Sequence, residues 1–183
     1  MIRWNDDTSG FQAWVDSDHA GLYKITGDYR SRLGVIITYN GMPVYWKSSW
    51  IKSICTSSGE AEIYALSEAV RATLNLKYIG EELGISVPDT PVIRCDATAA
   101  LGFASNTGTV GRLKHIDLRN EWVQQLRSAE TIKVKEDTKT NKADQFTKIL
   151  STTEYQKGED ELMPEVSEGS NKNPAIKDRG TDE

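Results

Sequence analysis

The sequence predicts an α/β fold in which a mixed sheet of five strands is flanked by helices. A short alternating segment is followed by two β-rich segments, and Asn40-Gly41 between them is a strong signal for a tight hairpin. A long stretch with helical periodicity then leads to a further apolar strand. Strands that come first, with helices and strands alternating later, predict a mixed sheet rather than a doubly wound parallel one.

Three antiparallel strands are expected to open the fold. Residues 11–16 (FQAWVD) alternate apolar and polar side chains, as a half-buried strand does. Residues 34–39 (GVIITY) and 42–47 (MPVYWK) flank Asn40 and Gly41, both of which accept the positive φ of a type I′ turn. These three segments therefore predict an antiparallel meander.

A long helix is expected to follow the meander and to lead back to the sheet. Thr56, Ser57 and Ser58 are candidate N-caps, and Gly84 is the expected end. Apolar residues recur between them at helical spacing: Ala61, Ala65, Ala69, Ala72, Leu76, Ile79 and Leu83. Residues 92–96 then form a strand, which a right-handed crossover would place parallel to the first.

Four shorter elements complete the expected domain. The sequence predicts helices over residues 98–105, 115–127 and 142–150, and a strand over 131–134. Together with the meander and the strand at 92–96, the last strand makes a sheet of five. One domain of about 150 residues is an ordinary length for such an architecture.

The C-terminal part differs in composition from the rest. Residues 151–183 have little apolar periodicity and contain nine acidic and four basic residues, so the net charge of −5 belongs to this segment. We expect a disordered acidic tail, because such a segment buries too little apolar surface to order itself. Residues 1–150 are then a neutral domain, whose charge neither indicates nor excludes nucleic-acid binding.

The two cysteines and the absence of long apolar stretches bear on the compartment. Cys55 and Cys95 lie in or beside expected core segments without CxxC spacing, so we predict buried free thiols rather than a disulfide or zinc site. No stretch approaches the roughly 20 apolar residues that span a bilayer, and no signal sequence opens the chain. We expect an intracellular, cytoplasmic protein with no membrane partner.

Four acidic residues stand at the ends of strands or the starts of helices: Asp16, Glu62, Asp96 and Asp144. In the expected topology both strand ends and both helix starts meet at one edge of the sheet, where ligand sites of open α/β sheets form. Carboxylates gathered there repel one another unless cations neutralise them. The set therefore predicts a hard-metal site suited to phosphate chemistry.

The order of elements and six local segments resemble the ribonuclease H domain of copia-type retrotransposon polyproteins. The resemblance runs from about Phe11 to Leu150 and rests on segments that occur in the expected order: WVDSDHAG, YWKSS, TSSGEAEIYALSEA, IRCD, LKHIDLRNEWV and NKADQFTKIL. It implies a ribonuclease H-like fold. It also implies metal-dependent hydrolysis of the RNA strand of RNA/DNA hybrids.

The resemblance assigns each acid a role in binding two Mg²⁺ ions, for which Mn²⁺ can substitute. Asp16 would be shared by both metals, Glu62 and Asp96 would complete one site, and Asp144 would help to hold the other. Glu60 competes with Glu62 for the helix position. The expected partners are an RNA/DNA hybrid and a reverse transcriptase domain encoded upstream, with the chain itself a monomer.

The sequence departs from the family pattern at several places. His19 replaces a common aromatic residue, Gly59 a hydroxyl residue, and Ala97-Thr98 a polar amide pair. Cellular ribonucleases H carry a mobile His before the last Asp, and residues 131–142 contain none. None of these changes removes an expected metal ligand, but each bears on substrate contacts, product release or water activation.

Two groups of residues outside the acids have alternative interpretations. His115 and Asp117 lie in a family segment, and we expect them to cap or pack a helix. Two tryptophans and two lysines either contact a nucleic-acid backbone or pack at the edge of the hairpin: Trp46, Trp50, Lys47 and Lys52.

The sequence leaves more than one function open. The alternative to an active nuclease is a catalytically weak or inactive domesticated remnant that binds nucleic acid or protein, because no reverse transcriptase segment precedes the first strand in this sequence. An integrase of the same fold is disfavoured by the order of the four acids and by the lack of a His/Cys zinc segment.

Overall fold

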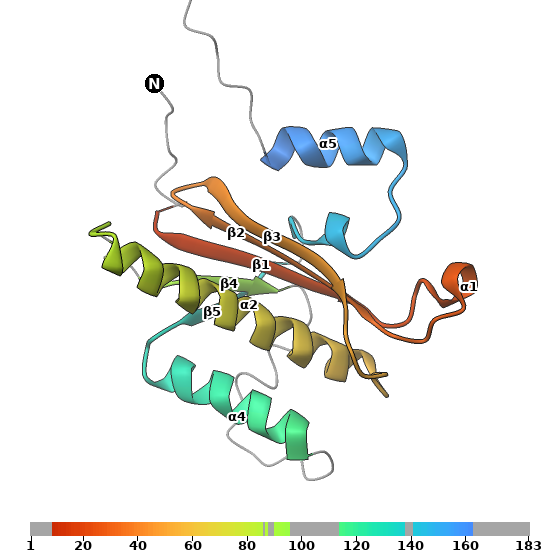
Figure 1. Ribbon diagram of the computed structural model, residues 1–183, viewed down its shortest axis with the longest axis horizontal. Helices are drawn as coiled ribbons and strands as arrows, with labels where there is room; N and C mark the ends of the chain where they lie inside the picture. The colour runs from red at the N-terminus through yellow and green to blue at the C-terminus, as the bar shows by residue number, and fades with distance from the viewer. Residues whose placement is uncertain (1–8, 86, 88–89, 96–113, 138–140, 163–183) are drawn as a thin grey trace, which may run out of the picture.

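The computed structural model describes residues 9–85, 87, 90–95, 114–137 and 141–162. Within these ranges a five-stranded sheet has the order β3-β2-β1-β4-β5. Figure 1 shows the sheet between α2 and α4 on one side and α5 on the other. The predicted five-stranded mixed sheet with flanking helices is confirmed.

The antiparallel meander consists of β1 (Phe11–Asp18), β2 (Arg32–Tyr39) and β3 (Met42–Trp50). Asn40 and Gly41 at the hairpin have φ values of 49° and 83°, as the type I′ turn requires. Each strand extends beyond its predicted bounds, because ladder pairing continues to Asp18↔Arg32 and Arg32↔Trp50.

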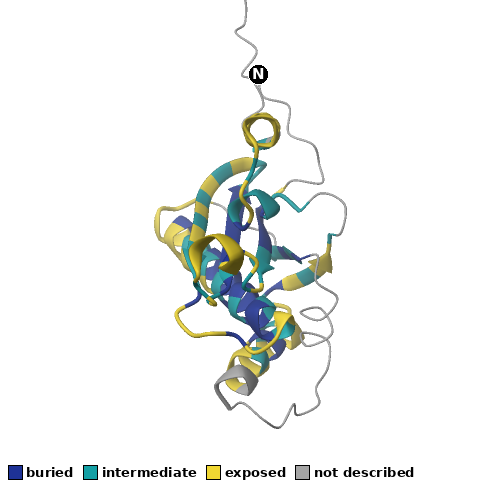
Figure 2. Ribbon diagram, turned by 90° about the vertical axis from the view of Figure 1, so that its right-hand side faces the viewer, coloured by how far each residue is buried: buried dark blue, intermediate teal, exposed yellow. Residues whose placement is uncertain are grey.

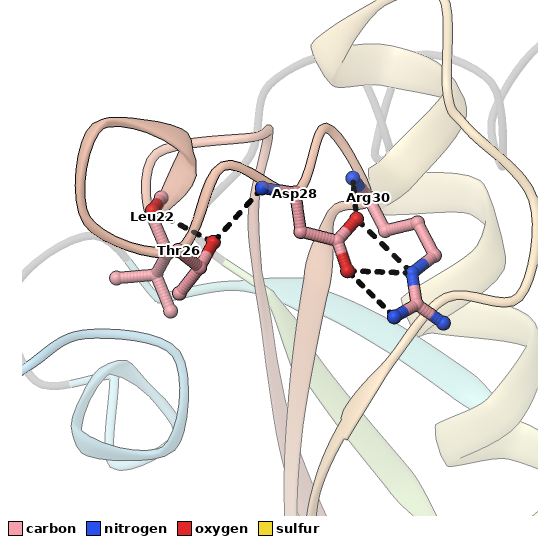
Figure 3. Close-up of polar contacts among 4 residues, drawn as sticks. All are labelled: Leu22, Thr26, Asp28 and Arg30. Carbon is pink, nitrogen blue, oxygen red and sulfur yellow. Dashed lines mark hydrogen bonds and ion pairs between the residues drawn. The ribbon is translucent and has the colours of Figure 1, made fainter.

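The loop between β1 and β2 contains a helix that the sequence did not predict, α1 (Tyr23–Thr26). The hydroxyl of Thr26 donates to the backbone oxygen of Leu22 at 3.0 Å and accepts from the backbone nitrogen of Asp28 at 3.1 Å (Figure 3). Arg30 binds the Asp28 carboxylate at 2.6 Å through Nη2 and holds the pKa of Asp28 below its usual range. Local polar contacts of this kind favour turns over regular structure.

The long helix α2 (Ser58–Glu82) crosses one face of the sheet. Ser57 caps it by accepting a hydrogen bond from the backbone nitrogen of Glu60, and the positive φ of Gly84 follows its end. The predicted start and end are confirmed. The main core fills the space between α2 and the sheet. Figure 2 shows the buried residues gathered in this central part of the molecule.

After α2 the chain returns to the sheet as β4 (Val92–Cys95), parallel to β1 as predicted. Next come α4 (Lys114–Ser128), packed beside α2, and β5 (Lys133–Glu136), parallel to β4. The strand predicted at 131–134 begins two residues later, because Glu130 adopts a positive φ of 53° in the turn that ends α4. The helix predicted at 98–105 lies outside the described residues.

The predicted helix at 142–150 is wrong. The segment forms only a 3₁₀ turn, η2 (Asp144–Phe146). Side chains provide alternatives to helical hydrogen bonds here: Asn141 Oδ1 accepts from the backbone nitrogen of Ala143, and the Thr147 hydroxyl lies 3.0 Å from the backbone oxygen of Asp144.

The prediction of a disordered tail over 151–183 needs correction in its first part, where α5 (Thr152–Leu162) forms. Ser151 and Glu154 make a capping box: Glu154 Oε2 accepts from the backbone nitrogen of Ser151 at 2.8 Å, and the Ser151 hydroxyl accepts from the backbone nitrogen of Glu154 at 3.3 Å. Leu162 then packs against Trp14 and Ile36 on the outer face of the sheet. A domain boundary at residue 150 stays a prediction.

Two smaller predictions can also be compared with the structure. Cys55 and Cys95 are free and buried, as expected, and burial raises the pKa of the Cys55 thiol. In the part of the chain that the structure describes, no helix has both the length and the hydrophobicity needed to cross a bilayer.

Candidate active site

Asp16 lies on β1, opposite Gly34 of β2. A side chain at Gly34 would meet the backbone oxygen of Ala143 at 2.8 Å, Cβ of Phe146 at 2.8 Å and Cγ2 of Thr147 at 3.0 Å. Gly34 therefore lets the segment around η2 lie directly on the sheet beside Asp16. The close approach of backbone is the reason for a glycine at this strand position.

Polar side chains fix the η2 segment to β1. Asn141 donates through Nδ2 to the backbone oxygen of Val15 at 2.9 Å. The hydroxyl of Thr147, which is fully buried, donates to Oδ2 of Asp16. The segment that carries Asp144 is thus held against the strand that carries Asp16, although 131 positions of sequence separate Asp16 from Thr147.

The two oxygens of the Asp144 carboxylate have different surroundings. Oδ2 forms an ion pair with Nζ of Lys148 at 2.5 Å, and both side chains are substantially exposed. Oδ1 is buried and accepts no hydrogen bond from any described residue. A buried carboxylate oxygen without a donor is costly, and a cation at this position would relieve the cost.

Glu60 and Glu62, the two candidates on α2, differ in their roles. Glu60 is buried, and its Oε2 accepts from the backbone nitrogen and hydroxyl of Thr56 at 2.7 and 2.9 Å. Glu60 therefore stabilises the N-terminus of α2. Glu62 lies one turn into α2, and its Oε2 is a buried atom.

Asp96 lies outside the described residues. The last described residue of β4, Cys95, is paired with Val15, the neighbour of Asp16. Within the described ranges, no three His, Cys, Asp or Glu side chains are grouped closely enough to hold a metal ion. The site of four carboxylates thus stays a prediction. The structure brings together two of the segments that carry them, the strand of Asp16 and the segment of Asp144.

The sequence analysis did not identify the residues that hold the η2 segment against the sheet: Asn141, Thr147 and Gly34. Thr147 and Asn141 lie in or beside the family segment NKADQFTKIL, but hydrogen bonds to a distant strand cannot be read from a linear pattern. The strand predicted at 34–39 starts at Gly34, and only the observed extension of β2 to Arg32 puts this glycine inside a strand, where it marks close backbone approach.

The other residues singled out from the sequence have the following places. Nε2 of His19 lies 3.1 Å from the backbone oxygen of Cys55, a contact near the start of α2. The side chains of His115 and Asp117, and both residues of Ala97-Thr98, lie outside the described part.

Trp46 is 61% exposed and faces α5 across the outer surface of the sheet, where a cavity of about 240 Å³ separates them.

The sequence has relatives among transposon proteins. It is 30% identical over 146 residues to a retrovirus-related Pol polyprotein from transposon TNT 1-94 of Nicotiana tabacum, a match covering 79% of this chain and 11% of the polyprotein. The chain therefore spans about a tenth of the length of that relative. No protein-family model matches the sequence.

Solved structures share the fold. One is LC11-RNase H1, isolated from compost by a metagenomic approach, with a TM-score of 0.53, 20% identity, and 75% of this chain and 92% of that chain covered. Another is LC11-RNase H1 in complex with an RNA/DNA hybrid, with a TM-score of 0.50, 15% identity, and 69% and 84% of the two chains covered. The chain is therefore a relative of one segment of the retrovirus-related Pol polyproteins of copia-type plant transposons, and the part that the structure describes has the ribonuclease H fold.

Proposed function

We propose that the chain is a metal-dependent endonuclease that hydrolyses the RNA strand of RNA/DNA hybrids. The observation that carries the proposal is the attachment of the Asp144 segment to β1 beside Asp16, through the Thr147 hydroxyl, in a ribonuclease H fold. LC11-RNase H1, which shares this fold, has been solved with an RNA/DNA hybrid, which supports the choice of substrate.

The available donor set fits Mg²⁺. All four proposed ligands are carboxylates, the hard oxygen donors that Mg²⁺ prefers. The buried Oδ1 of Asp144 lacks a hydrogen-bond donor among the described residues, as an oxygen reserved for a cation would. Because Oε2 of Glu60 already accepts hydrogen bonds from Thr56 at the N-terminus of α2, we favour Glu62 as the metal ligand from this helix.

In this proposal the residues of the chain hold and orient the reacting groups. Two Mg²⁺ ions, when bound, would lower the pKa of the attacking water and stabilise the leaving 3′ oxygen. Asp16, Glu62, Asp96 and Asp144 would hold them, with Asp16 shared. Thr147 orients the Asp16 carboxylate by donating to its Oδ2.

The relatives support a proposal about the natural partner of the chain. The tobacco relative is a Pol polyprotein many times longer than the chain, so we propose a linked reverse transcriptase segment as the partner that delivers the hybrid. A cytoplasmic location is part of the same proposal.

A second candidate function is a weakly active or inactive remnant that binds nucleic acid or protein. The ion pair of Asp144 with Lys148 favours it, because Lys148 already neutralises one of the proposed ligands. A metal ion at Oδ1 of Asp144 would bind a carboxylate whose charge Lys148 already offsets.

The test is cleavage of an end-labelled RNA/DNA hybrid by the purified chain with Mg²⁺, with the Asp16→Asn variant as control. We expect endonucleolytic products from the RNA strand with the wild type and none with the variant. Tight hybrid binding without cleavage under Mg²⁺ or Mn²⁺ would reject the nuclease and support the remnant.

A further inference from the structure

Trp14 lies on β1, two residues before Asp16. Side chains two positions apart on a strand stand on the same face of a sheet, so Trp14 and Asp16 share the outer face. The residue between them, Val15, belongs to the main core on the other face. Trp14 is only 5% exposed and belongs to the same buried cluster as Ala143, the residue before Asp144. The indole is therefore enclosed on the side from which the Asp144 segment approaches the sheet.

The indole N–H binds the residue that follows β5. Nε1 of Trp14 donates to Oδ2 of Asp137 at 3.2 Å. The same carboxylate oxygen lies 3.9 Å from Nη1 of Arg94 on β4, and both side chains of this ion pair are largely buried. The backbone nitrogen of Asp137 donates to the backbone oxygen of Cys95 at 2.9 Å. Asp137 is thus fixed to two neighbouring strands, through the indole to β1 and through its backbone to β4.

The aromatic face of Trp14 binds a residue that directly precedes the η2 turn. Nζ of Lys142 lies 4.8 Å from the centre of the Trp14 ring, within the roughly 6 Å at which cations are attracted to an indole. Asn141, the residue before Lys142, donates to the backbone oxygen of Val15. Lys142 is only two residues before Asp144, so its position strongly constrains where Asp144 can lie.

The residue type suits both contacts. An indole combines an N–H donor with the aromatic face that attracts cations most strongly, whereas phenylalanine has no donor. A second cation supports the ring from β4, because the guanidinium of Arg94 lies 5.6 Å from the ring centre and its Nε donates to Oε1 of Gln12 at 3.1 Å. A requirement for apolar volume alone would not account for the bonded N–H and the two cations.

We propose that Trp14 is a positioning residue that fixes Asp144 beside Asp16 by holding Asp137 through its N–H and Lys142 through its ring. The inference rests on the proposed function for the metal ions that these carboxylates would bind. Trp14 acts through Asp144 and takes no part in the reaction itself.

The test compares Trp14→Phe with a matched control, Trp50→Phe. The first variant keeps an apolar aromatic ring, removes the N–H donor and weakens the attraction for cations. Trp50 also has two cations near its ring, Arg30 and Arg32 at 5.7 and 5.2 Å, but it lies at the end of β3 and does not contact Asp137 or Lys142 through any of these interactions.

Two measurements on the full chain need no nucleic acid. Amide hydrogen exchange by NMR follows the backbone N–H groups of Phe146 and Thr147, which donate to the backbone oxygens of Ala143 and Asp144 within the η2 turn. Water-proton relaxation measures the affinity for Mn²⁺. Cleavage of a labelled RNA/DNA hybrid is followed separately in Mg²⁺.

We expect Trp14→Phe to accelerate exchange at Phe146 and Thr147 roughly tenfold, and by a larger factor than in β2, whose amides report global unfolding. Mn²⁺ should bind about three- to tenfold more weakly, because the released turn no longer presents Asp144 at a fixed place. Trp50→Phe should leave the Mn²⁺ affinity within about twofold of the wild type, since its losses lie away from the proposed ligands.

The outcomes separate this proposal from the proposed function. Acceleration by the same factor in η2 and β2, with unchanged Mn²⁺ affinity, would assign Trp14 a packing role only and overturn the proposal, even if the wild type cleaves the hybrid. The expected changes in a chain whose wild type leaves the hybrid uncut would reject the nuclease and support the positioning role.

A second variant keeps the proposal testable if Trp14→Phe does not fold. Lys142→Met keeps the aliphatic part of the side chain and removes the cation from the Trp14 ring. We expect exchange at Phe146 and Thr147 to rise about threefold relative to β2, in keeping with the loss of one cation–π contact. Unchanged exchange in η2 would overturn the proposal.

Discussion

The hydroxyl of Thr147 donates a hydrogen bond to Oδ2 of Asp16 and so joins the η2 segment to β1. Thr147 is fully buried, so this donor has no substitute from solvent. The contact sets the orientation of the carboxylate to which we assign the central role in metal binding. Its removal should therefore affect both stability and activity.

Thr147→Val keeps the shape of the side chain and removes the donor. We expect a decrease of about 1.5 to 3 kcal/mol in the free energy of unfolding, the usual range for a hydrogen bond to a charged group. Denaturant unfolding measures it, with Thr147→Ser as the control that retains the hydroxyl and costs only about 1 kcal/mol for one methyl group. Equal stability of the Val and Ser variants would contradict the assigned role.

Gly34→Ala tests the close approach of η2 to the sheet. The added Cβ would lie 2.8 Å from the backbone oxygen of Ala143, so the segment must move away from Asp16. We expect a destabilisation of about 1 to 3 kcal/mol, as for other overpacked sites, together with loss of hybrid cleavage.

Gly80→Ala is the matched control for this substitution. Gly80 is buried in α2, but its added Cβ would come no closer than an ordinary 3.4 Å, to Cγ2 of Val87. Here we expect a gain of about 0.5 to 1 kcal/mol from helix propensity. Thermal unfolding of both variants decides the comparison, and a Gly34→Ala variant as stable as the wild type would exclude tight docking of η2.

Glu60 and Glu62 should separate stability from activity. Glu60→Gln weakens the hydrogen bonds to Thr56 and should cost about 1 kcal/mol of stability while cleavage persists. Glu62→Gln should slow cleavage by about a hundredfold or more, since a metal ligand supports several kcal/mol of transition-state stabilisation. Single-turnover cleavage and urea unfolding measure the two effects, and the reverse pattern would assign the ligand to Glu60.

The Lys148–Asp144 ion pair should compete with metal binding. Lys148→Gln frees Oδ2 of Asp144, so we expect half-maximal cleavage at a Mg²⁺ concentration a few-fold lower than in the wild type. The control is Lys77→Gln, which breaks a similar i,i+4 pair with Glu81 on α2 and should leave the Mg²⁺ dependence unchanged. A shift of equal size in both variants would show a general charge effect instead.

Burial raises the pKa of Glu68 on α2, but hydrogen bonds from Lys47 and Arg71, each at 2.6 Å, outweigh it and hold this pKa below its usual range. The lowered pKa predicts a pH-dependent contribution to stability. Its ordinary value is 4.5 and its folded pKa lies lower, so the contribution is present above pH 4.5 and is lost as the pH falls through the folded value. The difference in unfolding free energy between wild type and Glu68→Gln should therefore be largest near neutral pH and shrink below pH 4.5. A difference that stays constant from neutral pH to about pH 3 would disprove the linkage.

The fold was largely predictable because its signals are local. Asn40 and Gly41 set the hairpin through their own φ values, and Ser57 and Gly84 bound α2 through capping chemistry. The helix predicted at 142–150 failed because contacts with a distant segment decide the structure there. Residues 142–150 have helical periodicity, but docking of η2 onto Gly34 and Asp16 stops the helix after one turn.

The start of α5 is a different case, because its signal was present in the sequence. Ser151 and Glu154 have the spacing of a capping box, and the acidic composition of the segment outweighed it in the prediction. Packing of Leu162 on Trp14 and Ile36 supplies the apolar contact that composition alone does not reveal.

The sequence by itself determined the order of the five strands with α2 and α4 between them, the turn at Asn40-Gly41, the limits of α2, and the resemblance that assigns roles to four acidic residues. Periodicity, capping and turn preferences act between neighbours, so a linear pattern records them. Only the tertiary structure decided that Thr147 donates a hydrogen bond to Asp16 and that Glu60 accepts hydrogen bonds at the start of α2. The contact between Thr147 and Asp16 joins residues 131 positions apart, and the docking of the η2 segment on the sheet brings them within hydrogen-bonding range. The contact between Glu60 and Thr56 is local, but a sequence that offers two glutamates does not say which of them makes it.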